Sequence, residues 1–178
     1  MAVREILRLG HPALRTPAEP VPDDRVASPE VQQVVDDLID TLRNSGGVGL
    51  AAPQIGVGWQ VFVLESELPG DPRPVRVVIN PLLEPHGGEL VYDWEGCLSI
   101  PELVGLVPRH PAVRLWGKAR DGSPLDLELS GLPGRVAQHE YDHLHGIVFL
   151  DRMRDLRSLS FVPEWETLVA GDEKVAVG

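Results

Sequence analysis

A single cysteine, the lack of a long apolar run and a shortage of basic residues set the first limits on this chain. Cys97 has no second cysteine to pair with, so an internal disulfide is excluded, which suits a reducing compartment. Nowhere do about 18 apolar residues run together, as a transmembrane helix would require. Residues Met1 to Arg15 carry charges among their apolar side chains, unlike the apolar core of a secretory signal. We therefore expect a soluble, cytoplasmic protein with no membrane partner.

Basic residues are outnumbered, with 16 Lys and Arg against 27 Asp and Glu and a formal net charge of -11. Affinity for nucleic acid is built largely from Lys and Arg contacts, so this balance argues against direct nucleic-acid binding. Transient contact with a ribosome would need a local basic patch. The best candidates are Arg109, Arg114, Lys118 and Arg120, although basic residues at this spacing more often decorate a solvated strand surface.

A length of 178 residues corresponds to one ordinary domain. The 18 Gly and 17 Pro are spread as turns at short intervals, and no repeat or linker marks a domain boundary. We expect a single domain over residues 1–170 and a flexible acidic tail over residues 171–178.

Two helices are predicted with defined ends. The first covers residues 29–44, where Ser28 can cap the start and Gly46 ends the helix. Its apolar residues recur on one face: Val31, Val34, Val35, Leu38, Ile39 and Leu42. The second covers residues 132–145 and stops at Gly146.

Strand patterns fill the interval between these helices. They lie at residues 60–64, 75–80, about 90–92, 103–107, 112–116 and 125–129, and Asp121-Gly122 is typical of a hairpin turn. A further short helix is predicted over residues 164–169. This order predicts an α+β fold with mostly antiparallel sheets around the second helix and the first helix packed on a sheet.

The second helix contains a metal-binding motif, His139-Glu140-Tyr141-Asp142-His143. At about 100° per residue, His139 and His143 lie one turn apart on one side, so both imidazoles can share one ion. Glu140 lies where it can reach a water on that ion, as a general base must. The alternative is that these are ordinary polar residues of a solvent-exposed helix. Against it, Leu132, Val136 and the two histidines follow the spacing of a buried stripe.

An open catalytic site needs a third protein ligand. Asp151, Asp155 and Glu164 follow the helix without a recognisable pattern. Cys97 is another candidate, although a lone cysteine is more often buried and inert. The residues alone leave this choice open.

The segment from Gly46 to Gly56 is rich in small residues that let backbone approach a ligand closely. Gln54 within it could donate a hydrogen bond to a substrate oxygen. The segment lacks the spacing and the lysine of phosphate-binding loops, so no nucleotide is implied.

Together these segments resemble the peptide deformylases, which remove the formyl group from the N-terminal methionine of new polypeptides. The matching motifs are Leu9–Pro12, Gly47–Gln54, Glu95–Ser99, Gln138–His143 and Phe149–Asp151. The resemblance is to type 1 members and implies a metal-dependent hydrolase acting on N-formyl-methionyl peptides.

The resemblance implies that Cys97, His139 and His143 are the ligands of one divalent ion. Ferrous iron (Fe2+) is expected, with Zn2+, Ni2+ or Co2+ as substitutes. A thiolate with two imidazoles also suits such borderline ions on chemical grounds.

The family's chemistry assigns roles to Glu140 as general acid/base, and to the Gln54 side chain and the Leu98 backbone N–H as donors to the developing oxyanion. It also implies substrate contacts at an apolar pocket of Val48, Leu132 and Val136, and backbone pairing at Val48, Gly49 and Gly105.

Two positions depart from the common bacterial pattern. Val104 stands where many bacterial members have arginine, and Arg135 stands where an apolar pocket residue is common. Their surroundings resemble the mitochondrial-type branch, which implies altered peptide preference rather than lost activity. Arg109 is expected to pair with Glu95 behind the site, the alternative being ordinary surface charge.

Two other functions remain open at this point. One is a metallopeptidase that uses the same helix, and the other is a metal-binding, translation-associated module without turnover. The oligomeric state, monomer or dimer, is not indicated.

Overall fold

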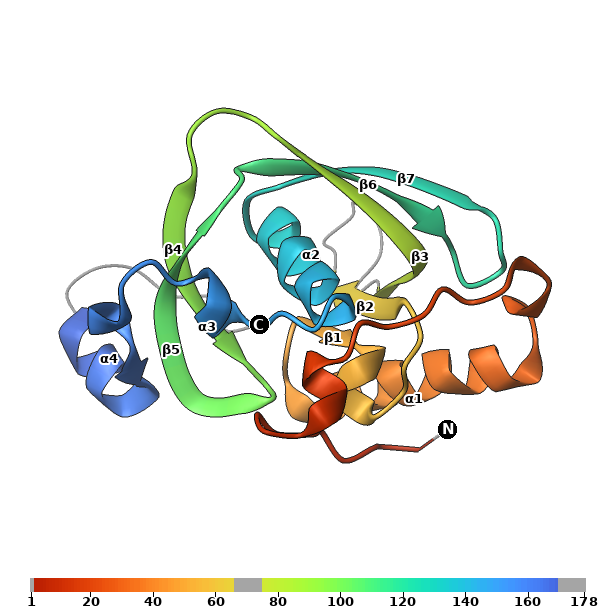
Figure 1. The fold of residues 1–178 in the computed structure, drawn as a ribbon, viewed down its shortest axis with the longest axis horizontal. Helices are drawn as coiled ribbons and strands as arrows, with labels where there is room; N and C mark the ends of the chain where they lie inside the picture. Colours follow the sequence, from red (N-terminus) through yellow and green to blue (C-terminus); the bar gives the residue numbers. More distant parts are fainter. Residues whose placement is uncertain (1, 66–74, 170–178) are drawn as a thin grey trace.

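The computed structural model describes residues 2–65 and 75–169, and the predicted tail over residues 171–178 lies outside them. The described chain has an α+β fold in which α2 (Gly131–Leu144) runs between two antiparallel sheets (Figure 1). The predicted fold class is therefore confirmed.

The larger sheet has the strand order β1-β2-β3-β6-β7. Its strands are β1 (Gly49–Ala51), β2 (Val61–Glu65), β3 (Val75–His86), β6 (Ala112–Lys118) and β7 (Pro124–Ser130). Asp121-Gly122 lies in the tight connection between β6 and β7, and Gly122 has φ 82°, a left-handed conformation that glycine adopts without strain. The predicted hairpin is confirmed.

The smaller sheet has the order β4-β5-β8, with β4 (Val91–Cys97), β5 (Ile100–Arg109) and β8 (Ser160–Phe161). A sharp turn joins β4 to β5, so that Cys97 pairs with Ile100, and the register shifts between Gly96 and Cys97. This irregularity sets the cysteine at the end of the ladder, facing α2.

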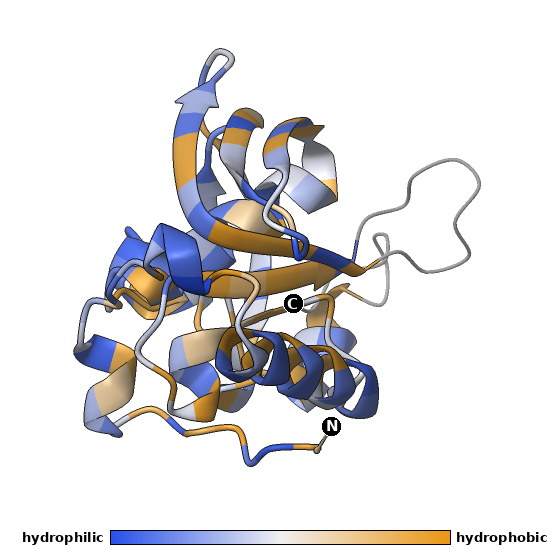
Figure 2. Cartoon of the chain, turned by 90° about the vertical axis from the view of Figure 1, so that its right-hand side faces the viewer, coloured by the Kyte–Doolittle hydropathy of each residue, from blue (hydrophilic) through white to orange (hydrophobic). Residues whose placement is uncertain are grey.

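Helix α1 (Pro29–Ser45) is one residue longer than predicted. The Ser28 hydroxyl accepts a hydrogen bond from the Val31 N–H, and Gly46 ends the helix at φ 72°. Hydrophilic and hydrophobic bands alternate along α1 in Figure 2, because one face packs against β2 and the other meets solvent. The buried face consists of Val31, Val35, Leu38 and Leu42.

The N-terminal segment ties two of the sequence motifs together. The Leu7 N–H donates to the carbonyl of Gln54, and the Leu9 N–H donates to that of Ser99, both at 2.8 Å. Gln54 lies in the short 3-10 helix η3 (Ala52–Ile55), which directly follows β1. One extended segment therefore spans the small-residue segment and the turn after Cys97.

The C-terminal part covers the smaller sheet. It contains α3 (Phe149–Arg152) and α4 (Val162–Val169), so the predicted short helix is confirmed with an earlier start. Trp165 of α4 is buried and its ring lies 5.7 Å from that of Trp94 in β4. Among the described helices, none is both long and apolar enough to cross a bilayer.

The four basic residues considered for ribosome contact do not form a free patch. Arg109 is buried, with 5% of its side chain exposed. The others each pair with an aspartate: Arg114 with Asp126, Lys118 with Asp23, and Arg120 with Asp36. Their charge is neutralised locally, so this surface offers little attraction for phosphates.

Candidate metal centre

Cys97, His139 and His143 converge at one buried point. Cys97 lies at the end of β4, and the two histidines lie one turn apart on α2. One potential ligand atom from each residue lies within 4.8 Å of the others. Cys97 Sγ is 3.3 Å from His143 Nε2. The structure thus brings the three predicted ligands together.

These positions fit a divalent ion. Tetrahedral coordination by one sulfur and two imidazole nitrogens places the ligand atoms about 3.3–3.6 Å apart, close to the observed Cys97–His143 distance. The other acidic candidates lie in different contacts: Asp151 pairs with Arg15, Asp155 pairs with Arg157, and Glu164 is exposed on α4. Geometry therefore favours the cysteine as the third ligand.

Glu95 holds the first histidine in place. Its Oε2 atom lies 3.0 Å from Nδ1 of His139, which leaves the other ring nitrogen to face Cys97. Arg109 donates to both oxygens of Glu95, and Arg135 donates to Oε1 at 2.8 Å. Burial alone would raise the pKa of Glu95, but the hydrogen bonds and charges of His139 and Arg109 lower it. The carboxylate is therefore ionised.

The predicted Arg109–Glu95 pair is confirmed, and it is buried rather than part of the surface charge, with each side chain 5% exposed. Arg109 also donates to Asp142 Oδ2 at 2.6 Å, and Asp142 accepts two further hydrogen bonds from Arg152. Burial disfavours the guanidinium charge, yet the partnership with Glu95 and Asp142 raises the pKa of Arg109. A network of ion pairs therefore connects Glu95, Arg109, Asp142 and Arg152 behind the candidate ligands.

The two histidines differ in their preferred protonation. Burial, together with the positive charges of His139 and Arg109, lowers the pKa of His143, which favours the neutral ring that a metal requires. Burial would also lower the pKa of His139, but hydrogen bonds to Cys97 and Glu95 raise it. An ion bound here would take the place of that proton.

Glu140 lies directly beside the ligands with its carboxylate fully buried. Its Oε2 atom has no hydrogen-bond partner among the described residues. Burial raises the pKa of Glu140 to about 7 in the ion-free protein, and the negative charge of Glu95 adds to this effect. A bound cation would lower this pKa. A buried carboxyl group beside the candidate ligands is in a suitable place to act as a general acid/base.

Gln54 presents its amide nitrogen to the site. Its Oε1 accepts a hydrogen bond from the Ala51 N–H at 2.8 Å, so Nε2 must point the other way. Nε2 lies 3.2 Å from Ser99 Oγ and 3.7 Å from Cys97 Sγ. A donor is thus fixed next to the ligand sulfur, where the following residue, Leu98, starts the turn between β4 and β5.

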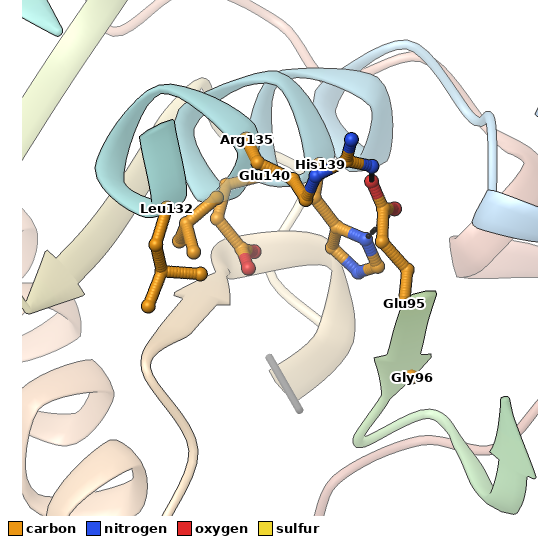
Figure 3. A pocket seen from close by; sticks show the side chains of 7 residues that line it. Glu95, Gly96, Leu132, Arg135, His139 and Glu140 are labelled. Atoms are coloured by element: carbon orange, nitrogen blue, oxygen red, sulfur yellow. Dashed lines mark hydrogen bonds and ion pairs between the residues drawn. The ribbon is translucent and has the colours of Figure 1, made fainter. Parts of the chain in front are cut away.

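A small pocket opens beside the ligands, along α2 (Figure 3). It is lined by Glu95, Gly96, Leu132, Arg135, Val136, His139 and Glu140. Leu132 was predicted on a buried stripe, but 43% of it is exposed because it lies in the first turn of the helix, at the pocket mouth. Arg135 lies against Glu95 with its guanidinium buried.

The remaining predicted substrate contacts lie on two strands or directly before one of them. Gly49 starts β1, an edge strand of the larger sheet that has one side without a strand partner in the described chain, and Val48 directly precedes it. Gly105 instead lies in β5 opposite Glu95, and its α-carbon faces Met153. It does not line the pocket.

Two contributors to the site were not identified from the sequence. Ser99 positions the Gln54 amide, and Asp142 anchors Arg109 and Arg152. A polar residue inside a metal motif, such as Asp142 between the two histidines, is a signal that could have suggested a supporting role. Its partners come from β5 and α3, which only the fold brings near.

Comparisons with known proteins agree with this arrangement. A model of the polypeptide deformylase family matches residues 3–158. Peptide deformylase 1 of Nitrosomonas europaea is 40% identical over 176 residues, covering 95% of this chain and 96% of that protein. A peptide deformylase of Parafrankia sp. is 46% identical over 154 residues, covering 86% and 80%. The Met-Ala-Ser-bound class I type b peptide deformylase of Acinetobacter baumannii matches with a TM-score of 0.78 and 33% identity, covering 85% of this chain and 100% of that one.

Proposed function

The chain belongs to the polypeptide deformylase family and hydrolytically removes the formyl group from nascent polypeptides, and we propose that Cys97, His139 and His143 hold the divalent ion used for this reaction. The observation that carries the proposal is the convergence of these three donors next to the buried carboxyl group of Glu140. A structural ion would need no such acid/base beside it.

The ion we propose is Fe2+, with Zn2+, Ni2+ or Co2+ able to substitute. One thiolate and two imidazoles form a borderline ligand set that accepts all four, so the ligand chemistry is compatible with this proposal. When bound, such an ion supplies Lewis acidity, which lowers the pKa of water and polarises the formyl carbonyl.

The protein groups around the proposed ion site carry out the remaining steps of the reaction. Glu140 accepts a proton from the attacking water and later delivers it to the nitrogen of the departing amine. The Gln54 amide and the Leu98 backbone N–H donate hydrogen bonds to the formyl oxygen as it gains negative charge. Glu95 keeps His139 in one orientation throughout.

The substrate we propose is the formyl-methionyl end of a nascent peptide. The relative from Acinetobacter baumannii was solved with Met-Ala-Ser bound, which is the sequence of a deformylated peptide start. We propose that the first side chain enters the pocket at Leu132 and Val136 and that the peptide backbone pairs with the backbone of Val48 and Gly49, where β1 begins. Gly105, buried within β5, is a less direct contact in this arrangement.

The setting we propose is the cytoplasm, where a lone cysteine stays reduced and new polypeptides emerge. Any transient ribosome contact would have to use a surface other than Arg114, Lys118 and Arg120, because these side chains pair with aspartates.

The proposal is tested by Glu140→Gln in protein purified and loaded with Fe2+ without oxygen. We expect formate release from formyl-Met-Ala-Ser to fall by about 10²–10⁴-fold while elemental analysis finds an unchanged ion content. Cys97→Ala should instead lose the ion. Full turnover by the Glu140→Gln protein would overturn the assigned role, and product masses that reveal cleavage of an internal peptide bond would indicate a metallopeptidase.

A further inference from the structure

Gly49 lies in β1 directly against the face of α2 that carries Glu140. A β-carbon placed on Gly49 would lie 2.4 Å from Glu140 Oε1, 2.9 Å from its Cδ and 2.7 Å from Val136 Cγ1. Contacts below 3.0 Å are far inside van der Waals distance, so any side chain at residue 49 would displace one of these groups. The strand and the helix can be this close only where residue 49 has no side chain.

No described protein group donates a hydrogen bond to Oε2 of Glu140. Glu140 Oε2 has no partner within the described parts of the chain, in contrast to Glu95, which is held by three side chains. The groups packed around the carboxyl group of Glu140 therefore contribute to its position. Gly49 is the close neighbour on the strand side, and Val136 of α2 lies beside the same point.

We propose that Gly49 is a positioning residue for Glu140, in addition to any backbone contact with substrate. Because Gly49 has no side chain, it leaves room for the Glu140 carboxylate beside the candidate ligands. This inference rests on the proposed role of Glu140 as the general acid/base. It assigns a steric reason to the second glycine of Gly47-Val48-Gly49.

Gly47 shows the same relationship to a second element. A β-carbon there would lie 2.8 Å from Leu98 Cδ1, in the turn after Cys97. Gly47 lies two residues before the start of β1, and its bare α-carbon faces Leu98, whereas that of Gly49 faces Glu140. Gly47 leaves room for Leu98, whose backbone N–H is the proposed donor, and Gly49 leaves room for Glu140, the proposed acid/base.

Gly49→Ala is the central variant, and Gly58→Ala is its matched control. Gly58 has negative φ, and a β-carbon there would meet nothing within 4 Å. For Gly49→Ala we expect kcat to fall about 100-fold with unchanged ion content and little change in KM, because a shift of the acid/base by about 1 Å has this effect. Gly58→Ala should behave like the unmodified protein. A rise in KM with unchanged kcat would overturn the proposal in favour of a clash with substrate.

A second measurement does not depend on turnover. The Tm of the ion-free protein is compared for Gly49→Ala alone and in the Glu140→Ala and Val136→Ala backgrounds, as a double-mutant cycle. We expect Gly49→Ala to lower Tm strongly, and much less once Glu140 is truncated. If Gly49→Ala alone does not fold, folding of the double variant with Glu140→Ala supports the contact. Failure of both to fold overturns it.

An equal loss of Tm in the presence and absence of the Glu140 side chain would also overturn the proposal. If the Tm of Gly49→Ala recovered only in the Val136→Ala background, Gly49 would instead serve the packing of β1 against α2. Failure of this inference can be distinguished from failure of the proposed function. If Glu140→Gln retained turnover while the Tm cycle showed coupling, the chemical role of Glu140 would fail but the contact with Gly49 would stand.

Discussion

Oε2 of Glu95 lies 3.0 Å from Nδ1 of His139, which joins a carboxylate on β4 to a candidate ligand on α2, 44 residues later in the chain. Both side chains are buried, at 5% and 6% exposure. The contact fixes which ring nitrogen faces Cys97, and it increases the basicity of that nitrogen. Glu95 would therefore influence an ion held by His139 without being a ligand itself.

Glu95→Gln should lower the affinity of the protein for the ion. The amide keeps the shape but lacks the charge that supports His139, so we expect affinity for Zn2+ to fall by about 10–100-fold. Competition with a chromophoric chelator measures this affinity directly. Glu164→Gln, on the exposed face of α4, is the control for loss of one negative charge. Equal affinities for both variants would show that Glu95 contributes only to packing.

Arg109→Met should reveal how much stability depends on the buried charges. Removing the guanidinium leaves Glu95 and Asp142 short of a donor inside the protein, so the free energy of unfolding should fall by about 3–5 kcal/mol. The matched variant is Arg114→Met, whose partner Asp126 is about half exposed, and a loss of about 0–1 kcal/mol is expected there. Urea unfolding of ion-free protein measures both. Similar losses would contradict the distinction between buried and exposed pairs.

The sequence predicted those features that depend on neighbours along the chain. The histidine pair on α2 follows from helical periodicity, and the limits of α1 follow from Ser28 and Gly46. β1 was not predicted, because Gly49–Ala51 has no alternating pattern and is a strand only through its pairing with β2.

Side-chain partnerships across the fold could be anticipated only in part. The Arg109–Glu95 pair was expected, but its burial was not, because burial depends on how α2 packs against the smaller sheet. The contact of Asp142 with Arg109 links α2 to β5 and depends on the packing of both around the core. Leu132 fits the helical stripe but is exposed, since periodicity gives a face and not the point at which the covering sheet ends.

Asp37→Asn should show a pH-dependent effect on stability at a place distant from the metal centre. Burial alone would raise the pKa of Asp37, but hydrogen bonds from Gln33, Arg4 and Ala2 lower it. A carboxyl whose pKa is lowered on folding stabilises the protein above its unfolded pKa of about 3.9, and this contribution is lost as pH falls through the folded value. The unmodified protein should therefore exceed the variant by about 1 kcal/mol near pH 6, and by progressively less below about pH 3.9.

Urea unfolding across this pH range measures the difference, and Asp40→Asn on the same helix controls for the change in net charge. A constant difference from about pH 6 to about pH 3 would contradict the assignment, since it would mean that the amide loses only packing or geometry.

Arg135→Leu should change the preference for the first residue of the peptide. The guanidinium lies in the pocket wall and donates to Glu95 Oε1 and to the carbonyls of Val107 and Val91 at 2.8–2.9 Å. Leucine removes this polar end and leaves space between α2 and β4. We expect the ratio of kcat/KM for formyl-methionyl over formyl-phenylalanyl peptides to fall by about tenfold. Three acceptors lose a donor, so stability should fall by about 1–3 kcal/mol. Because the ratio compares two substrates on one preparation, it is independent of the active fraction, and an unchanged ratio would exclude Arg135 as a determinant of side-chain choice.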